Sequence, residues 1–185
     1  MVKSNNFKKV SKKFSNFTEE EQWLQSMLQD GWVLKSYDSE DIDDCQYVFE
    51  PLQYAEQKNR IYKIDFRMFN KKEDFNEYNS LFNDVGWIGL AKHKGYFKHI
   101  FYTDSPKTNK DIFSDVESYK AREKQKMFIC FIYTLILVML FIIAVVLYKI
   151  YGNISILYGG IMTLFSNVQP LRSYYRHRKV YKSLV

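Results

Sequence analysis

Side chains able to do chemistry are few in this sequence and lie far apart. The histidines are His93, His99 and His177, and the cysteines are Cys45 and Cys130. A hydrolytic metal site needs three or four converging ligands, commonly at a spacing such as H-E-x-x-H, which this sequence lacks. Cys45 has no Cys or His beside it, and Cys130 lies in an apolar stretch, so neither is expected to act as a nucleophile. We therefore expect ordinary histidines, no cofactor, no metal and no enzymatic activity.

Carboxylates are densest in the segment DSEDIDDC at 38–45, which holds Asp38, Glu40, Asp41, Asp43 and Asp44. The favoured interpretation is a solvated hairpin loop. Calcium binding is a second one, although the EF-hand spacing and its terminal Glu are missing. An acidic contact for a basic partner is a third. The glycines of Gly86-x-x-Gly89 follow an expected helix instead of opening one, which is the wrong order for phosphate binding.

The longest apolar stretch is MFICFIYTLILVMLFIIAVVLY, residues 127–148, which carries no charge. As a helix it would measure about 33 Å, enough to cross a hydrocarbon core of about 30 Å. A second apolar stretch covers 154–171. The sequence therefore predicts a two-helix transmembrane hairpin over 127–171.

The second stretch contains small and polar residues at both ends. Ser155 and Gly159 stand four residues apart and could allow close approach of the two spans. Polar groups precede Pro170 at the other end, namely Ser166, Asn167 and Gln169. An interfacial position is the favoured interpretation of these groups, with helix packing or a pathway as the alternative.

The net charge of +6 comes entirely from the end of the chain, because residues 1–126 carry equal numbers of basic and acidic residues. Positive flanks stay on the cytoplasmic side, so we expect a two-pass cell-membrane protein with both termini cytoplasmic and about 149–153 outside. Lipid therefore accounts for the basic charge, and no nucleic-acid partner is expected. The residues expected at the lipid interface are Lys124, Lys126, Arg172, Arg176, Arg178 and Lys179.

Two segments of the first 110 residues follow one plan. Each shows helical apolar spacing and stops at a glycine, Gly31 or Gly86, the residue that most easily takes the left-handed conformation. A tryptophan follows at once, and we expect Trp32 and Trp87 to be equivalent and packed under their own helices. The expected capping boxes are Thr18 with Glu21 and Asn70 with Glu73.

Stretches typical of strands surround both helices. They cover 33–37, 46–50, 60–68, 88–91 and 96–102, and 7–14 suits an exposed edge strand. The predicted fold class is α+β, a duplicated β-α-β-β antiparallel sheet with two helices on one face, followed by the two-helix transmembrane hairpin. Such a layer leaves its other face, or an edge, free for a ligand or partner.

The quoted segments resemble a known family. The chain is similar to an uncharacterised family of Gram-positive bacterial membrane proteins, domain of unknown function 2812. The similarity lies in four segments: EEEQWLQSMLQDGW, RIYKIDFRM, NKKEDFNEYNSLFNDVGW and YFKHIFY. The resemblance covers roughly residues 7–104, and the hairpin is similar to members that carry one. It implies no activity and no site residues. Family members encoded beside PadR-type repressors imply regulated expression.

The segment 111–126, DIFSDVESYKAREKQK, lacks Gly and Pro and has acidic residues early and basic residues late, which suits the helix macrodipole. With a possible capping box at Ser114 and Glu117, it predicts one helix from about Asp115 through Tyr148. The expected organisation is a cytoplasmic duplicated α+β domain (1–110), a helical connector (111–126), the transmembrane hairpin (127–171, with spans 127–148 and 154–171) and a basic cytoplasmic tail (172–185).

Aromatic side chains make up 18% of the sequence. The aromatic side chains of the last expected strand, 96–102, fall on both of its faces. We expect one face to pack in the core, and the other face either to pack in the core as well or to bind a partner. The candidate partner-binding residues are Tyr96, Phe97, Phe101 and Tyr102.

The leading functional hypothesis is a membrane-anchored cytoplasmic binding or adaptor module, regulatory in character. It would act through a membrane protein partner, or through copies of itself, in contact with membrane lipid. The alternative is an accessory or immunity protein for a peptide exporter or antimicrobial peptide, with the transmembrane hairpin as the acting part.

Overall fold

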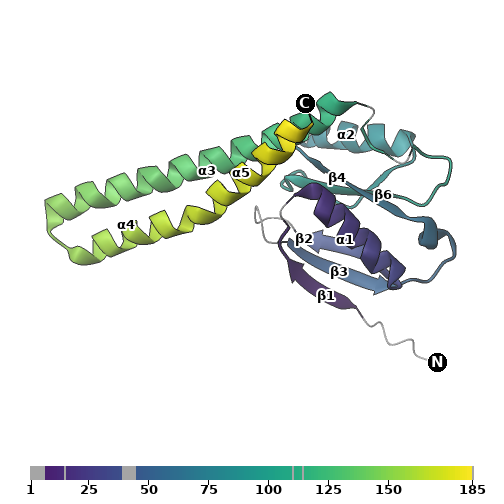
Figure 1. The fold of residues 1–185 in the computed structure, drawn as a ribbon, viewed down its shortest axis with the longest axis horizontal. Helices are drawn as coiled ribbons and strands as arrows, with labels where there is room; N and C mark the ends of the chain where they lie inside the picture. Colours follow the sequence, from purple (N-terminus) through teal and green to yellow (C-terminus); the bar gives the residue numbers. More distant parts are fainter. Residues whose placement is uncertain (1–6, 15, 39–44, 110, 114, 185) are drawn as a thin grey trace. The chain divides into compact units, whose positions relative to one another are not determined.

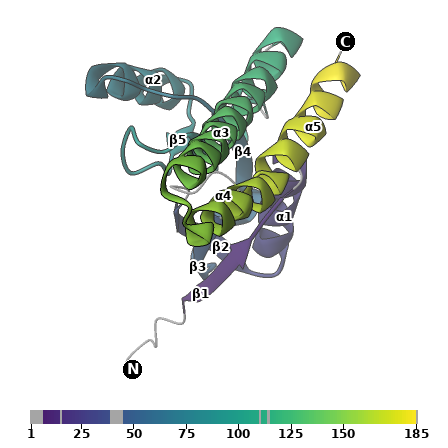
Figure 2. The same cartoon turned by 90° about the vertical axis from the view of Figure 1, so that its left-hand side faces the viewer.

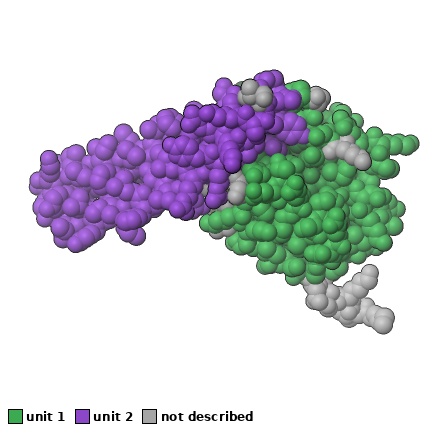
Figure 3. Space-filling model, in the orientation of Figure 1, with its two compact units in different colours: residues 1–115 green, residues 116–185 purple. Residues whose placement is uncertain are grey.

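The computed structural model describes residues 7–14, 16–38, 45–109, 111–113 and 115–184. The chain forms two compact units, residues 1–115 and 116–185 (Figure 3). The first unit is a mixed α/β structure and the second consists of helices. The acidic residues of the 39–44 loop lie outside the described residues, so the hypotheses about that loop remain predictions.

The first unit repeats the order strand, helix, strand, strand (Figure 1). Its strands form two three-stranded antiparallel sheets, ordered β1-β3-β2 and β4-β6-β5, each with its last strand in the centre. Two sheets replace the single sheet that was expected. The elements are β1 (Lys8–Lys12), α1 (Phe17–Gln29), β2 (Trp32–Asp38), β3 (Cys45–Pro51), the short 3-10 helix η1 (Glu56–Asn59), β4 (Ile61–Phe66), α2 (Lys72–Asp84), β5 (Ile88–Gly89) and β6 (Lys98–Thr103).

Tyrosine hydroxyl groups bridge the two sheets. The Tyr37 hydroxyl donates to the Lys98 carbonyl at 2.7 Å and accepts from the Ile100 amide at 3.1 Å. The Tyr62 hydroxyl accepts from the Leu34 amide at 2.9 Å, beside a bulge in β2. Side chains thus satisfy backbone groups where the two sheets meet, and β2 and β6 are not paired in one ladder.

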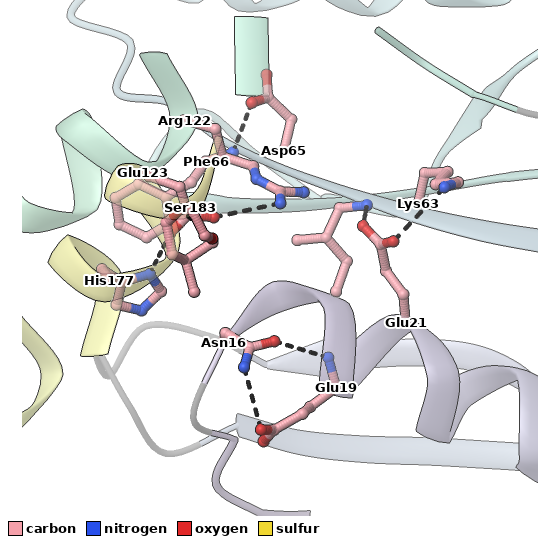
Figure 4. A network of polar contacts seen from close by, with 12 residues as sticks. Asn16, Glu19, Glu21, Lys63, Asp65, Phe66, Arg122, Glu123, His177 and Ser183 are labelled. Carbon is pink, nitrogen blue, oxygen red and sulfur yellow. Dashed lines mark hydrogen bonds and ion pairs between the residues drawn. The ribbon is translucent and has the colours of Figure 1, made fainter. Parts of the chain in front are cut away.

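Helix α1 belongs to the first repeat but also closes the edge of β4. Glu21 accepts from the Ile64 amide at 3.0 Å, and Gln25 donates to the Arg60 carbonyl at 2.9 Å. Lys63 of β4 forms a salt bridge with Glu21 at 3.7 Å (Figure 4). An edge strand whose backbone groups are occupied in this way is protected from pairing with other chains.

The expected glycine stops are present, but the helix starts differ from the prediction. Gly31 and Gly86 have φ of 83° and 86°, in the left-handed region. The side chain of Asn16 caps α1 by accepting from the Glu19 amide at 2.9 Å, so the capping pair is two residues earlier than Thr18 and Glu21. Helix α2 starts after Lys71 without a side-chain cap, so Asn70 does not have the expected role.

Trp32 and Trp87 are not equally buried. Trp87 is 1% exposed and packs in a cluster with Tyr78 and Phe101, whereas Trp32 is half-buried with the Lys8 ammonium 5.4 Å from its ring centre. The expectation of equal packing is therefore wrong for Trp32. Its place at the end of the outer strand β2, opposite Pro51, leaves one side of the ring uncovered.

The second unit is built from α3 (Val116–Tyr151), α4 (Ile154–Ser166) and α5 (Val168–Ser183). Helix α3 is continuous, as the sequence predicts, and Figures 1 and 2 show it beside α4 and α5. Gly152, with φ of 68°, ends α3, and the side chain of Asn153 caps α4 by accepting from the Ser155 amide at 3.0 Å.

The predicted span 154–171 is not one helix, because it is interrupted at Asn167. Pro170 has no N–H group to donate to the Ser166 carbonyl, and its ring is incompatible with a continuous helix there. The Asn167 amide donates to the Leu164 carbonyl at 3.1 Å, which tightens the last turn of α4. The expected basic tail is helical, because α5 continues to Ser183.

Helices α3 and α4 approach each other closely at Gly160. A Cβ atom at Gly160 would lie 2.7 Å from the Cβ of Ala144, so only glycine fits without movement. Gly159, which the sequence suggested for close approach, has no neighbouring atom within 4 Å of such a Cβ. The small residue at the helix contact is therefore one position later than expected.

Candidate functional site

A buried ion pair lies between α1 and β6. The Lys98 ammonium is 2.9 and 3.0 Å from the two carboxylate oxygens of Glu20, and the Tyr47 hydroxyl donates to Glu20 at 2.6 Å. Burial by itself would lower the pKa of Lys98, but the negative charge of Glu20 outweighs it and raises this pKa. Burial also raises the pKa of Tyr47 and of the Cys45 thiol. These groups therefore keep their protons at neutral pH, and the contacts of Glu20 with Lys98 and Tyr47 connect α1 to the two sheets.

The second repeat has a different buried polar group. Asp65 accepts from the Tyr78 hydroxyl at 2.6 Å and from the Phe66 amide at 2.7 Å. His99, paired with Asp65 across β4 and β6, has Nε2 3.0 Å from the Arg67 carbonyl oxygen. In the part of the chain that the structure describes, its buried Nδ1 has no hydrogen-bond partner. Burial lowers the pKa of His99. The pKa of Tyr78 is raised mainly by burial and secondarily by the negative charge of Asp65.

The four aromatic residues proposed for partner binding do not form an exposed surface. Tyr96 and Phe101 are fully buried, and Phe97 and Tyr102 are half-buried. The strand packs under α2 on one side, and the Arg60 guanidinium lies 3.7 Å from the ring centre of Tyr102 on the other. The interpretation as core accounts for Tyr96 and Phe101, and partner binding by the half-buried Phe97 and Tyr102 stays a prediction.

A hollow of about 190 Å³ lies on the opposite face of the first sheet from α1. We call it the sheet hollow. Its polar side chains come from three strands and from the segment after β5; all are exposed except the half-buried Ser36, and sequence reasoning selected only Asp38, as part of the acidic segment 38–45. The register of β1, β2 and β3 brings the strand residues together, and the second repeat adds Lys92. They are Lys9, Ser36, Asp38, Gln46 and Lys92, and Tyr37, Tyr47 and Val48 complete the lining.

Helix α3 exposes apolar side chains along most of its length, from Phe128 to Ile150, and α4 does the same from Ile154 to Phe165. Helix α3 is long and apolar enough to cross a membrane. Of the basic residues expected at the lipid interface, Lys126 is buried. The others are exposed: Lys124, Arg172, Arg176, Arg178 and Lys179.

Polar side chains meet between α3 and α5. Glu123, which is fully buried, lies 2.6 Å from Nδ1 of His177 and 3.2 Å from the Arg122 guanidinium (Figure 4). Nearer the apolar segment, the side-chain Nδ2 of Asn167 donates to the Thr134 carbonyl at 3.4 Å. His177 therefore belongs to a helix contact, which its position in an apparent tail did not reveal.

Among the described residues, no group of three or more His, Cys, Asp or Glu side chains is placed to hold a metal ion. A family model described as a protein of unknown function (DUF2812) matches residues 16–135, about two thirds of the chain. The chain belongs to this family. The DUF2812 match begins at the N-cap of α1 and continues into α3, so it includes the first repeat without β1, the whole second repeat and the first part of the long helix. No curated protein and no solved structure matches the chain.

Proposed function

We propose that this DUF2812 protein is a membrane-anchored cytoplasmic binding module that acts, without catalysis of its own, through a membrane protein partner. The observation that carries the proposal is the surface of α3, where large apolar side chains from Phe128 to Ile150 are exposed. A soluble protein rarely exposes so much contiguous apolar surface, whereas a lipid bilayer would cover it.

The second membrane crossing would combine α4 with the first turn of α5. The 13 residues of α4 measure about 20 Å, which is shorter than the hydrocarbon core. Extending the crossing to Leu171 brings it to about 27 Å, so the interruption at Asn167 would lie near the interface. Such a position suits an asparagine and a proline, because water and headgroups can satisfy the open backbone groups.

Exposed basic residues support a cytoplasmic position for α5. Arg172, Arg176, Arg178 and Lys179 follow the second apolar stretch, whereas the turn between α3 and α4 contains only Gly152 and Asn153. Since basic flanks remain on the cytoplasmic side, this asymmetry favours cytoplasmic termini and an outward-facing turn.

Cysteine labelling tests the topology. In a variant whose two native cysteines are replaced by serine, Asn153→Cys should react with a membrane-impermeant maleimide in intact cells, and Lys107→Cys should react only after permeabilisation. Both positions are exposed, so burial does not distort the comparison. Labelling of Lys107→Cys in intact cells would contradict the cytoplasmic location, and recovery of the full chain in the soluble fraction would contradict the anchor.

A further inference from the structure

The sheet hollow exists only because the two repeats associate. Lys9, Val48 and Ser36 lie in one row across β1, β3 and β2, on the face away from α1. Lys92 comes from the segment that follows β5 in the second repeat. Ligand sites are commonly formed at such junctions, because two elements supply opposite walls.

The segment after β5, which carries Lys92 and forms one wall of the sheet hollow, is attached to the first sheet. The Tyr96 hydroxyl donates to the Tyr37 carbonyl at 3.2 Å, and the two rings are in contact with their centres 5.3 Å apart. Tyr37 is in turn held by the backbone of β6 through Lys98 and Ile100. The position of the wall is therefore determined by buried contacts close to the hollow.

Of the lining residues that the structure describes, Lys9 and Lys92 are positive and Asp38 is negative. Within the described residues, neither the Lys9 nor the Lys92 ammonium has a hydrogen bond or an ion pair, and both side chains are exposed. The carboxylate of Asp38 lies at the same rim, and Ser36 and Gln46 add neutral hydrogen-bonding groups. A ligand that matches this pattern carries two negative groups and one positive group.

We propose that the sheet hollow binds an acidic amino acid, or a close analogue with two carboxylates and one ammonium group. Lys9 and Lys92 each hold one carboxylate, Asp38 receives the ammonium group, and Ser36 and Gln46 supply hydrogen bonds. The volume of about 190 Å³ admits a molecule of this size and is smaller than the pockets of about 300–1,000 Å³ typical of larger ligands. This inference names a ligand class for the binding module proposed above and rests on that proposal.

Phosphate is the competing anion, but the site does not have the usual features of a phosphate site. Phosphates are commonly held by backbone N–H groups of a helix N-terminus or a glycine-rich loop, or by the paired donors of arginine. The hollow is lined by strands and one loop segment, and its cations are lysines. The Asp38 carboxylate would also repel a phosphate, whereas it attracts the ammonium group of an amino acid.

Calorimetric titration of the full-length protein in lipid nanodiscs tests the proposal with L-glutamate as the probe. Glutamate should bind saturably, and Lys9→Gln or Lys92→Gln should weaken its affinity about tenfold or more, because each removes one charge contact. Lys58→Gln is the matched control: Lys58 is an exposed lysine of η1 outside the hollow, and its loss should leave binding unchanged.

Two further probes separate the alternatives. Glutarate has both carboxylates but no ammonium group, so it should bind more weakly than glutamate, and Asp38→Asn should weaken glutamate without weakening glutarate. Inorganic phosphate should bind more weakly than either. The proposal is overturned if glutamate shows no saturable binding, if the Lys9→Gln and Lys92→Gln variants bind it as well as the unchanged protein, or if phosphate binds equally well.

Membrane association is measured separately, by flotation of the same protein with lipid vesicles. Loss of glutamate binding with normal flotation would overturn the ligand assignment and leave the membrane anchor intact. Thermal melting of each variant without ligand verifies folding, and these exposed substitutions should leave the melting temperature within the range of the Lys58→Gln control.

Discussion

The two repeats of the α/β unit share a strand order but attach their helices by different chemistry. Tyr47 and His99 occupy corresponding places, each four residues before the end of the central strand and facing its helix. Tyr47 donates to Glu20 of α1, which also holds the Lys98 ammonium. His99 contacts the ring of Tyr78 of α2 instead. The topology therefore tolerates either an ion pair or an aromatic cluster, provided that most buried polar atoms have partners.

The difference extends to the tryptophans. In the second repeat Trp87 completes the aromatic cluster under α2. In the first repeat Trp32 is only half-buried, and α1 is held instead by Glu20 and by Trp23. The first repeat thus depends more on charged contacts and the second more on apolar burial. Substitutions at matched positions should separate these two contributions.

The largest difference is expected for the tryptophans. Trp87→Ala should lower the free energy of unfolding of the first unit by about 3–5 kcal/mol, because it empties a fully buried site. Trp32→Ala should cost clearly less, since part of that ring is already in water. Urea titration of the full chain, with proteolysis of the first unit as readout, measures both. Equal losses would mean that the two sites are energetically equivalent after all.

The buried ion pair should give the next largest effect. Glu20→Gln should destabilise the first unit by about 3 kcal/mol, because it leaves the Lys98 ammonium without its carboxylate. The double variant Glu20→Gln with Lys98→Met should recover much of this loss, since no buried charge remains. The same urea titration applies. A double variant as unstable as Glu20→Gln alone would show that the stranded charge is not the cause.

A smaller loss is expected when one hydroxyl group is removed. Tyr78→Phe should cost about 1.5–3 kcal/mol, because Asp65 loses a hydrogen bond of 2.6 Å. Tyr47→Phe should cost less, since Lys98 still neutralises Glu20. If Tyr47→Phe proved the more damaging of the two, the hydroxyl of the first repeat would matter more than its ion pair.

The smallest effect concerns pH and the second repeat alone. Burial lowers the pKa of His99 below its ordinary value of about 6.5, so below that pH the unfolded chain takes up a proton that the folded chain resists. His99 should therefore contribute a loss of stability as pH falls from about 6.5, with a slope of at most about 1.4 kcal/mol per pH unit.

The groups around His99 include Asp65 and both the carbonyl and the positive charge of Arg67 on the β4 side, and the rings of Phe69, Phe75 and Tyr78. Urea titrations between pH 7 and pH 5 should show a shallower pH dependence in His99→Gln than in the unchanged chain. Parallel pH profiles would assign the acid sensitivity to other groups.

Local sequence signals predicted most of the element order. Glycines at 31 and 86 mark the helix ends because a left-handed residue is needed there, and alternation of apolar and polar residues marks β4. The predicted helix starts were less accurate, because several Ser, Thr and Asn residues near each start can act as caps and the choice depends on the approach of the chain. Pro170 was a sequence signal for the helix interruption at Asn167, but the apolar residues around it favoured the prediction of one continuous span.

The sequence by itself determined the long apolar helix, the charge asymmetry around it and the repeated strand–helix–strand–strand order, because each depends on residues close together in the chain. Only the tertiary structure decided that Glu20 would meet Lys98, that Glu123 would meet His177, and that lysines 9 and 92 would border one hollow. Those pairs are separated by 54 to 83 positions, and their meeting depends on strand register and helix rotation. A shift of one residue in a strand turns every side chain to the other face, so no pattern within a single segment can specify such contacts.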